Sequence, residues 1–496
     1  MILANRSSNR NFQTRLPVMK AAAERCCALI LCCAGSLALP LTAAHARPAA
    51  ATPVIFEPDM PLGGHDATTD GGRNETTVAV NPRDPSNLVA GFHDLVSPFH
   101  AQACRFASTR DGGRTWTLGG TAPLEANAVT CFDPTMAADA RGNFYYSYGQ
   151  FSVDAAGIET YDLLVAKSTD GGESFPTFTV AGRYGVVDPD KPVIAADAWS
   201  KSRFKGTLYL AFLDLLGYTG TEIRVVVSRD GGATWSAPVR ISRTVPTGGD
   251  EGVHGPMPVV APDGTVYVFY AEGIRRGRGP FSLKFASSAD GGRTWSPPAD
   301  VASGLPSPIG FKLRNSSPQF GTATLEGVSA NSFPTAAAAA DGTLYVAWVD
   351  FPNGSCIDLP GLPACTNSDV RLSVSRNGGR AWSPPVKVTD ETNPTDQFLP
   401  WIAAHPGGVL SLVWLDKRLD SQNQNYDTFY TNTPDARVFL PNVRVSSESS
   451  IIGQATFIGD YNGLAVTEKE VFPIWGDLRS RDHVEIFTTR GTLAVP

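Results

Sequence analysis

The sequence predicts an all-β fold, a single seven-bladed β-propeller of four-stranded antiparallel blades, with six blades as the alternative. A glycine-rich turn recurs five times, first as ASTRDGGRTWTL at residues 107–118, and the first four copies lie 59, 60 and 60 residues apart. Short β-rich segments such as GTLYLAFLD and IRVVVS flank the copies, without helical periodicity. A regular unit of this kind is typical of a propeller blade.

The first 46 residues differ from the rest of the 496-residue chain. Five basic residues precede an apolar run from Cys26 to Ala44, and Ala44-His45-Ala46 supplies small residues at a suitable cleavage spacing. We therefore expect residues 1–46 to be a secretory signal peptide and residues 47–496 to be one propeller domain, secreted or periplasmic and without a membrane span. An uncleaved membrane anchor is the alternative, because the apolar run has 19 residues.

The formal charge is −7, and removing five bases and one acid with the signal leaves −11. Such an acidic body disfavours nucleic acid as a partner.

Four of the eight cysteines remain after the signal, and an even number in an exported chain predicts two disulfides. The predicted pairs are Cys104–Cys131 and Cys356–Cys365. Zinc is the rival, but the spacing fits no zinc finger.

The recurring turn has a structural explanation. Its acid can accept hydrogen bonds from the backbone of the tight bend, its glycines can take positive φ, and its aromatic residue can pack between neighbouring sheets. The residues at the acid position are Asp111, Asp170, Asp230, Asp290 and Asn377.

Seven units follow when strand patterns are counted with the turns. The last unit stops after its third strand, near Arg490, and TPVIFEP near the predicted mature N-terminus is a spare strand. Pairing TPVIFEP into the last blade would close the ring and cover its edges.

Polar residues gather where, by topology, first strands begin and second strands end, which places both on one rim opposite the recurring turns. Strand starts supply Arg73, Glu75, Asp133, Asp190, Lys191, His254, Asp460 and Tyr461. Strand ends supply His93, Asp94, Asp214, Glu272, Asp350, Asp416, Arg418, Asp477 and Arg479. The role of any single acid here can be purely structural, the capping of a loop, but the whole set predicts a polar pocket on the channel axis.

The five turns resemble the Asp-boxes, or bacterial neuraminidase repeats, of sialidases and other secreted propellers. Sialidases have six blades, which is fewer than the seven units counted. The resemblance implies three arginines that clamp a sugar carboxylate, an acid/base, a tyrosine nucleophile and its activating glutamate. Carried over by position, these are Arg73, Arg418 and Arg479 as the clamp, Asp94 as acid/base, Tyr461 as nucleophile and Glu272 as activator. His254, Asp416 and Asp477 would complete the substrate contacts.

The resulting prediction is a sialidase-like glycoside hydrolase that acts as a monomer on sialic acid or a similar acidic sugar. Two alternatives stay open: a non-catalytic propeller that binds glycan or protein, and a lyase on acidic polysaccharide with His254 and Tyr461 as proton carriers. No motif for an organic cofactor is found. We therefore expect no cofactor, with calcium bound by the acids of the rim as the alternative.

Overall fold

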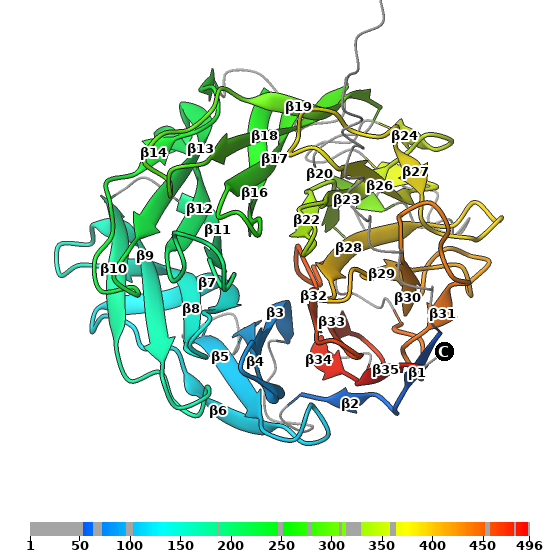
Figure 1. Ribbon diagram of the computed structural model, residues 1–496, viewed down its shortest axis with the longest axis horizontal. Helices are drawn as coiled ribbons and strands as arrows, with labels where there is room; N and C mark the ends of the chain where they lie inside the picture. Colours follow the sequence, from blue (N-terminus) through cyan, green and yellow to red (C-terminus); the bar gives the residue numbers. More distant parts are fainter. Residues whose placement is uncertain are drawn as a thin grey trace, which may run out of the picture. The chain divides into compact units, whose positions relative to one another are not determined.

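The computed structural model describes residues 53–62, 72–95, 103–185, 189–246, 251–274, 280–306, 310–313, 329–357, 364–451, 457–480 and 483–494. Its β-strands form seven antiparallel blades in a ring around a central channel, as Figure 1 shows. The seven-bladed prediction is confirmed, and the six-bladed alternative is wrong. The signal peptide lies outside the described residues and stays a prediction.

Each blade runs outward from a first strand at the channel. Blade 1 contains β3 (Arg73–Asn81), β4 (Asp84–Asp94), β5 (Ala103–Thr109) and β6 (Thr117–Thr121). Blade 2 contains β7 (Ala128–Ala138), β8 (Phe144–Val153), β9 (Glu159–Ser168) and β10 (Phe178–Gly185). Blade 3 contains β11 (Pro189–Ala196), β12 (Leu208–Asp214), the 3-10 turn η1 (Leu216–Tyr218), β13 (Gly220–Ser228), β14 (Val239–Arg240) and β15 (Val245–Pro246). Blade 4 contains β16 (Glu251–Val260), β17 (Val266–Ile274), β18 (Phe281–Ser288) and β19 (Ala299–Leu305).

The remaining blades follow the same plan. Blade 5 contains β22 (Thr335–Ala338), β23 (Leu344–Asp350), β26 (Asp369–Ser375) and β27 (Val386–Lys387). Blade 6 contains β28 (Gln397–Ala404), β29 (Leu410–Asp416), β30 (Asp427–Thr433) and β31 (Val443–Arg444). Blade 7 contains β32 (Gly463–Val466), β33 (Glu470–Asp477), β34 (Glu485–Thr488) and β35 (Gly491–Leu493), with β1 (Val54–Phe56) and β2 (Met60–Pro61). No helix in the described part of the chain is long and apolar enough to cross a membrane.

The N-terminal segment closes the ring in blade 7. β1 pairs with β35 and β2 pairs with β34, so these two short strands take the place of a fourth strand. In Figure 1 they lie in blue beside the red C-terminal strands. The closure predicted for TPVIFEP is confirmed, with GTLAVP contributing β35 rather than a loose end.

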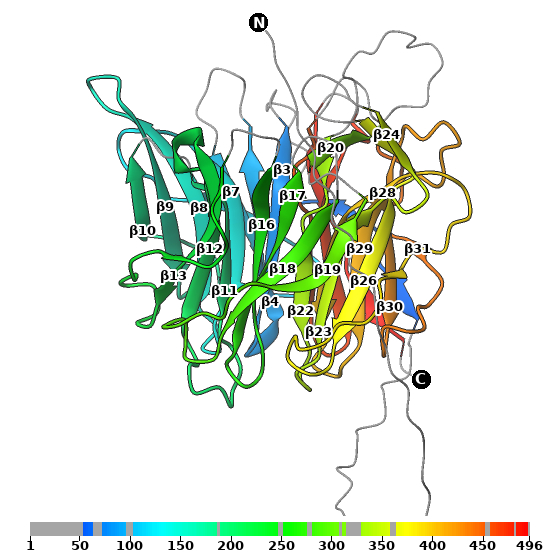
Figure 2. The same ribbon diagram turned by 90° about the horizontal axis from the view of Figure 1, so that it is seen from above.

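The ring has two distinct faces. First strands begin and second strands end at the face that we call the top, and the Asp-boxes lie between third and fourth strands at the other face, the bottom. Strands run roughly along the channel in Figure 2. Two insertions in blade 5 add a small sheet of β20 (Gly310–Leu313), β21 (Ser329–Asn331), β24 (Ser355–Ile357) and β25 (Ala364–Thr366).

The Asp-boxes are built as the sequence predicts. In the third box, Asp230 Oδ1 accepts from the backbone of Thr234 (2.9 Å) and Oδ2 accepts from its hydroxyl (2.5 Å). These two hydrogen bonds lower the pKa of Asp230 to about 2. In the fifth box, Asn377 Oδ1 accepts the same backbone bond from Ala381 at 2.9 Å, so the turn needs an oxygen acceptor rather than a charge.

Buried aromatic residues hold the blades together. Every second strand places a fully buried aromatic side chain two residues before its last polar position, and these residues are Phe92, Tyr148, Phe212, Tyr270, Trp348, Trp414 and Trp475. The aromatic residues of the boxes pack between neighbouring blades, as Trp382 does against Phe269 and Phe285 of blade 4.

The disulfide prediction is confirmed for Cys104–Cys131, whose sulfurs join β5 of blade 1 to β7 of blade 2. Cys365 is also disulfide-bonded, and its backbone register partner is Cys356. The side chain of Cys356 lies outside the described residues, so that second pair stays a prediction.

Candidate functional site

A repeated backbone irregularity surrounds the top of the channel. The first strands of blades 1, 2, 3, 4 and 6 each shift register near their beginning, and the residue inside the shift has a positive φ. Cross-strand alignment assigns one such bulge position to every blade. In blade order these positions hold Glu75, Asp133, Lys191, Gly255, Phe333, Leu399 and Tyr461. Left-handed backbone at Glu75, Asp133 and Lys191 is strained, and such strain is concentrated at functional sites.

Lys191 is the centre of the charged half of this ring. Its Nζ lies 3.1 Å from Glu75 Oε1, 2.6 Å from Asp133 Oδ1 and 2.6 Å from Asp460 Oδ2. Burial alone would lower the pKa of Lys191, but these three carboxylates raise it well above its usual value. Lys191 is therefore a permanent cation. Its three donors link blade 3 to blades 1, 2 and 7, and its charge offsets the negative charge of the acids around it.

Asp133 and Asp190 form an acid–carboxylate pair beside Lys191. Burial and the nearby Glu75 carboxylate raise the pKa of Asp133 well above its usual range, and Asp190 shares a hydrogen bond with it. Partial burial opposes ionisation of Asp190, but Lys191 and His254 lower its pKa. The Asp190 side chain is 25% exposed, whereas that of Asp133 is 5% exposed. The shared proton therefore belongs to the inner residue, Asp133, and the charge belongs to the outer residue, Asp190.

Two histidines flank this group. His254 Nε2 lies 3.3 Å from Asp190 Oδ2, and its ring stacks on Phe333 with centroids 4.3 Å apart. On the other side, His93 Nδ1 lies 3.6 Å from Glu75 Oε2. Each histidine is thus placed beside a carboxylate that can stabilise its protonated form.

An open pocket of about 440 Å³ lies over this charged half, on blades 1 to 3. Its floor includes Glu75, Asp133, Asp190, Lys191 and His93, and its walls include Phe132, Phe151, Tyr161 and Phe457. The rings of Phe151 and Tyr161 lie 5.1 Å apart and are partly exposed. None of the described arginines lines this pocket. Acids and aromatic rings around a concavity of this size are suited to a small polar ligand with apolar faces.

The other half of the channel mouth is apolar. Phe333, Leu399 and Trp401, together with prolines that follow the bulge positions, line a narrow space of about 40 Å³ that also reaches Lys191 and Asp460. The two halves meet at Tyr461, whose ring lies 5.8 Å from Lys191 Nζ and 6.2 Å from the Trp401 ring.

Tyr461, the predicted nucleophile, lies in the mouth but is not hydrogen-bonded to a carboxylate through any contact that the structure describes. Its hydroxyl donates to the carbonyl of Pro134 at 3.1 Å. Burial, followed by the charges of Glu75 and Asp133, raises the pKa of Tyr461 well above its usual value. Both effects disfavour the phenolate that nucleophilic attack needs.

The other predicted catalytic residues lie in separate networks. Asp94 is fully buried, 3.4 Å from Arg73 Nε and 3.1 Å from Arg105 Nη1. Glu272 lies 3.1 Å from Arg243 Nε and 3.8 Å from Lys284 Nζ.

Arg418 and Arg479 form two copies of one motif. Trp414 donates to Asp416 at 2.7 Å and Arg418 pairs with that carboxylate at 2.8 Å, while its guanidinium covers Phe429. Trp475, Asp477, Arg479 and Phe487 repeat this arrangement in blade 7. The remaining donors of Arg418 reach Asp390, Glu391 and Asn442, and those of Arg479 reach Asp59 and Ser447.

The six residues predicted to converge therefore do not meet in one pocket. The reason is strand alternation: the acid that ends a second strand lies two residues after a buried aromatic side chain, so both face the interface between blades. The residues that do meet begin first strands, and the hub Lys191 and the acids Glu75, Asp133, Asp190 and Asp460 were part of the predicted rim without assigned roles. A proline after most bulge positions, as in Asp133-Pro134 and Lys191-Pro192, was the sequence signal that marked this register.

Comparisons with known proteins agree with this architecture. A family model described as BNR repeat-like domain matches residues 217–317, a span that holds the third and fourth Asp-boxes. No curated protein is detectably similar in sequence.

Several solved structures are similar to the chain at low identity. The intramolecular trans-sialidase of Ruminococcus gnavus is 13% identical with a TM-score of 0.46, over 74% of this chain and 94% of that one. The α-L-arabinanase of Penicillium chrysogenum is 14% identical with a TM-score of 0.45, over 75% and 96%. A PL25 ulvan lyase is 12% identical with a TM-score of 0.47, over 84% and 94%. The resemblance to Asp-box propellers is confirmed, and the chain is an all-β, seven-bladed propeller with BNR-like repeats.

Proposed function

We propose that the protein is a carbohydrate-active propeller that hydrolyses a glycan without a carboxylate group in the open pocket over blades 1 to 3. The observation that carries this proposal is the buried acid Asp133 hydrogen-bonded to the outer carboxylate Asp190, beneath partly exposed aromatic rings. Titratable pairs whose pKa values are pushed apart are suited to acid–base catalysis. The aromatic walls are suited to the apolar faces of a sugar ring.

The reaction needs one proton donor and one proton acceptor. The Asp133–Asp190 pair would give its proton to the leaving glycosidic oxygen through Asp190, its outer member. His93, supported by the Glu75 carboxylate, would take a proton from the water that attacks the sugar carbon. Lys191 would position both sides through its contacts with Glu75, Asp133 and Asp460 and would form no covalent bond with the substrate.

The charge of the site is the reason for choosing a glycan without a carboxylate. With Asp133 protonated, three carboxylates face one ammonium, so the floor is negative when both histidines are neutral. An anionic sugar would be repelled, and the three arginines of the predicted clamp already serve Asp94, Asp416 and Asp477. A sialidase mechanism through Tyr461 is therefore not our proposal.

The test is a glycan panel with one matched pair of variants. Purified protein is incubated with neutral, amino-sugar, sialylated and uronic-acid glycans, and new reducing ends and unsaturated products are measured. We expect hydrolysis in the neutral or amino-sugar group, and Asp133→Asn should lower the rate by about 10²- to 10⁴-fold while binding persists. Asp300→Asn, on the outer strand β19, is the control and should leave the rate unchanged.

Three outcomes would contradict the proposal. Equal rates for Asp133→Asn and wild type would show that Asp133 does not supply the proton. Release of unsaturated products would indicate a lyase. Binding of a glycan without turnover in wild type would make the pocket a recognition site.

A further inference from the structure

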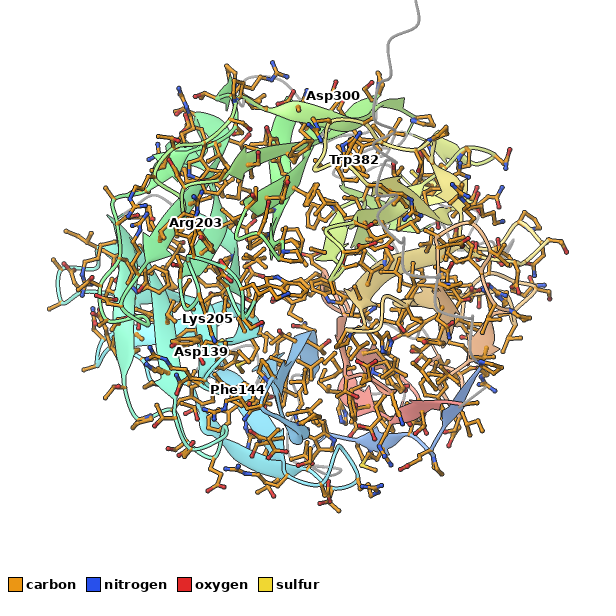
Figure 3. All side chains as sticks on the ribbon, in the orientation of Figure 1. Asp139, Phe144, Arg203, Lys205, Asp300 and Trp382 are labelled. Atoms are coloured by element: carbon orange, nitrogen blue, oxygen red, sulfur yellow. A yellow bond between two sulfur atoms is a disulfide. The ribbon has the colours of Figure 1, made fainter. Side chains whose placement is uncertain are left out.

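A second pocket opens at the bottom face, where blades 2 and 3 meet. It has a volume of about 450 Å³ and is lined by Arg141, Lys167, Lys205 and Arg229, with Asp139, Asp230 and Tyr145 among its other residues. Figure 3 labels Asp139 and Lys205, which lie next to each other on this part of the ring. This blade 2–3 pocket is on the face opposite the proposed glycan site.

The four basic side chains have no carboxylate partner. No carboxylate oxygen of the described residues lies within 4.0 Å of any of their nitrogens. Arg141, Lys205 and Arg229 are exposed, and Lys167 is half-buried with its ammonium 5.3 Å from the Tyr145 ring centroid. Four cations without a described carboxylate partner around one cavity are unusual on a chain whose formal charge is −7.

The two acids of the pocket are satisfied by other partners. Asp139 accepts from the backbone N–H of Arg141 and of Asn143, from the Asn143 amide and from the Tyr145 hydroxyl, at 2.8 to 3.0 Å. Asp230 accepts within its own Asp-box from Ser228 and Thr234. Their lone pairs are therefore directed into their own turns, and the cations are left to face the cavity.

The Asp-box pattern is interrupted at this cavity, as it also is at the fourth box, where Ala289 precedes the acid. The residue before the box acid is an arginine in three boxes, and it donates to a carbonyl of the next turn: Arg110 to Asp170, Arg229 to Gly291 and Arg376 to Asp435. The second box has Thr169 instead. Lys167, from β9, crosses to the third box, where Nζ donates to the Gly231 carbonyl at 3.2 Å, and Thr179, from β10, donates to the next carbonyl of that box at 2.7 Å.

We propose that the blade 2–3 pocket binds an oxyanion group, a sulfate or phosphate ester carried by a ligand of saccharide size. Mutual repulsion of four cations is relieved by a bound anion, and guanidinium groups match the oxygens of sulfate and phosphate. The volume is within the range of small-ligand sites and exceeds what a single inorganic ion needs. The proposal is independent of the chemistry at the top face.

The test is calorimetric titration of the full chain at constant low ionic strength, because exposed charges are screened by salt. The probes are inorganic sulfate, inorganic phosphate, a sulfated disaccharide and its unsulfated parent. We expect the sulfated disaccharide to bind and the parent to give no signal at this pocket. Sulfate alone binding as tightly as the disaccharide would support the oxyanion site and assign it to the free ion, and phosphate binding more tightly than sulfate would support it with phosphate as the preferred group.

A charge-matched pair of double variants locates the site. Arg141→Gln with Lys205→Gln removes two exposed cations of the pocket, and affinity should fall at least about tenfold. Lys201→Gln with Arg293→Gln removes two exposed cations outside it and should change affinity by less than about twofold. Melting curves verify that both variants fold. Absence of binding by wild type to all three anionic probes, or equal affinity in the two double variants, would overturn the proposal.

Discussion

Two rows of structurally equivalent residues surround the top of this propeller. Residue identity changes from blade to blade in one row and is nearly constant in the other. The bulge positions of the first strands hold Glu75, Asp133, Lys191, Gly255, Phe333, Leu399 and Tyr461. The ends of the second strands hold Asp94, Gln150, Asp214, Glu272, Asp350, Asp416 and Asp477, six acids and one amide. Because all seven blades need the same packing, the nearly uniform row is structural, and the row in which blades diverge supplies the residues of our proposed site.

Replacing the charge at the centre of the varied row should have the largest effect on stability. Lys191→Met leaves the Glu75 and Asp460 carboxylates without their cation and the Asp133 acid without a hydrogen-bond donor, which should lower the free energy of unfolding by about 3–5 kcal/mol at neutral pH. The raised pKa of Lys191 means that its contribution is present at neutral pH and is lost only as pH rises above about 10.5. Denaturant titration measures the change, and Lys201→Met is the control for an exposed lysine. An exposed ion pair contributes at most about 1 kcal/mol. A decrease in the free energy of unfolding smaller than this would show that Lys191 does not organise the row.

An intermediate effect should come from the uniform row. Arg479→Met removes hydrogen bonds to the buried acids Asp477 and Asp59 and should cost about 2–3 kcal/mol. Arg418→Met removes the equivalent bonds in blade 6, so both variants should lose similar stability.

The two arginine variants should differ in one respect. Asp59 belongs to the closing segment, so only Arg479→Met should expose residues 54–62 to hydrogen exchange or proteolysis. The lowered pKa of Asp59 means that its contribution is present at neutral pH and is lost as pH falls through its folded pKa, so acid should loosen the same segment in wild type. Equal protection of residues 54–62 in the two variants would show that Arg479 does not secure the closure.

The smallest effect should come from Asp350. Burial raises its pKa to about 6, so its ionisation destabilises the folded state as pH rises from about 4 to 6, and the penalty persists above that range. Asp350→Asn should therefore increase stability by about 1–2 kcal/mol at pH 7 and leave it nearly unchanged at pH 4. Thermal unfolding at the two pH values measures the difference. A variant that is less stable than wild type at pH 7 would show that the carboxylate is needed at this position.

Most of the fold could be predicted because it depends on local chemistry. The Asp-box acids, the blade count, the closing strand and Cys104–Cys131 all follow from turn residues, spacing and topology. The signal peptide, the monomeric state, calcium binding and the secreted or periplasmic location stay predictions.

The candidate site was harder to predict because the two rows of polar residues lie on adjacent strands. The bulge positions are on first strands, next to the channel, and the acids are at the ends of second strands, one strand further from the axis. Sequence analysis placed Asp94 and Arg479 on the same rim as Lys191, which is correct, but rim position does not show which way a side chain faces. That direction depends on the alternation of side chains along a strand, in which residues two apart lie on the same face. Phe92 is buried between blades and lies two residues before Asp94, so the acid faces a neighbouring blade as well. The ion pairs of Lys191 join three blades and could not be derived from local pattern.

The pairing of β1 and β2 with β35 and β34 links the order of folding to the order of synthesis. The strands made earliest complete the same sheet as those made last, so the ring cannot close until the ribosome has released nearly the whole chain. Until then β1 and β2 lack the blade 7 strands with which they pair, and exposed sheet edges make an all-β chain open to wrong pairing. Production of the intact protein should therefore depend on its early segment being protected while the rest is made.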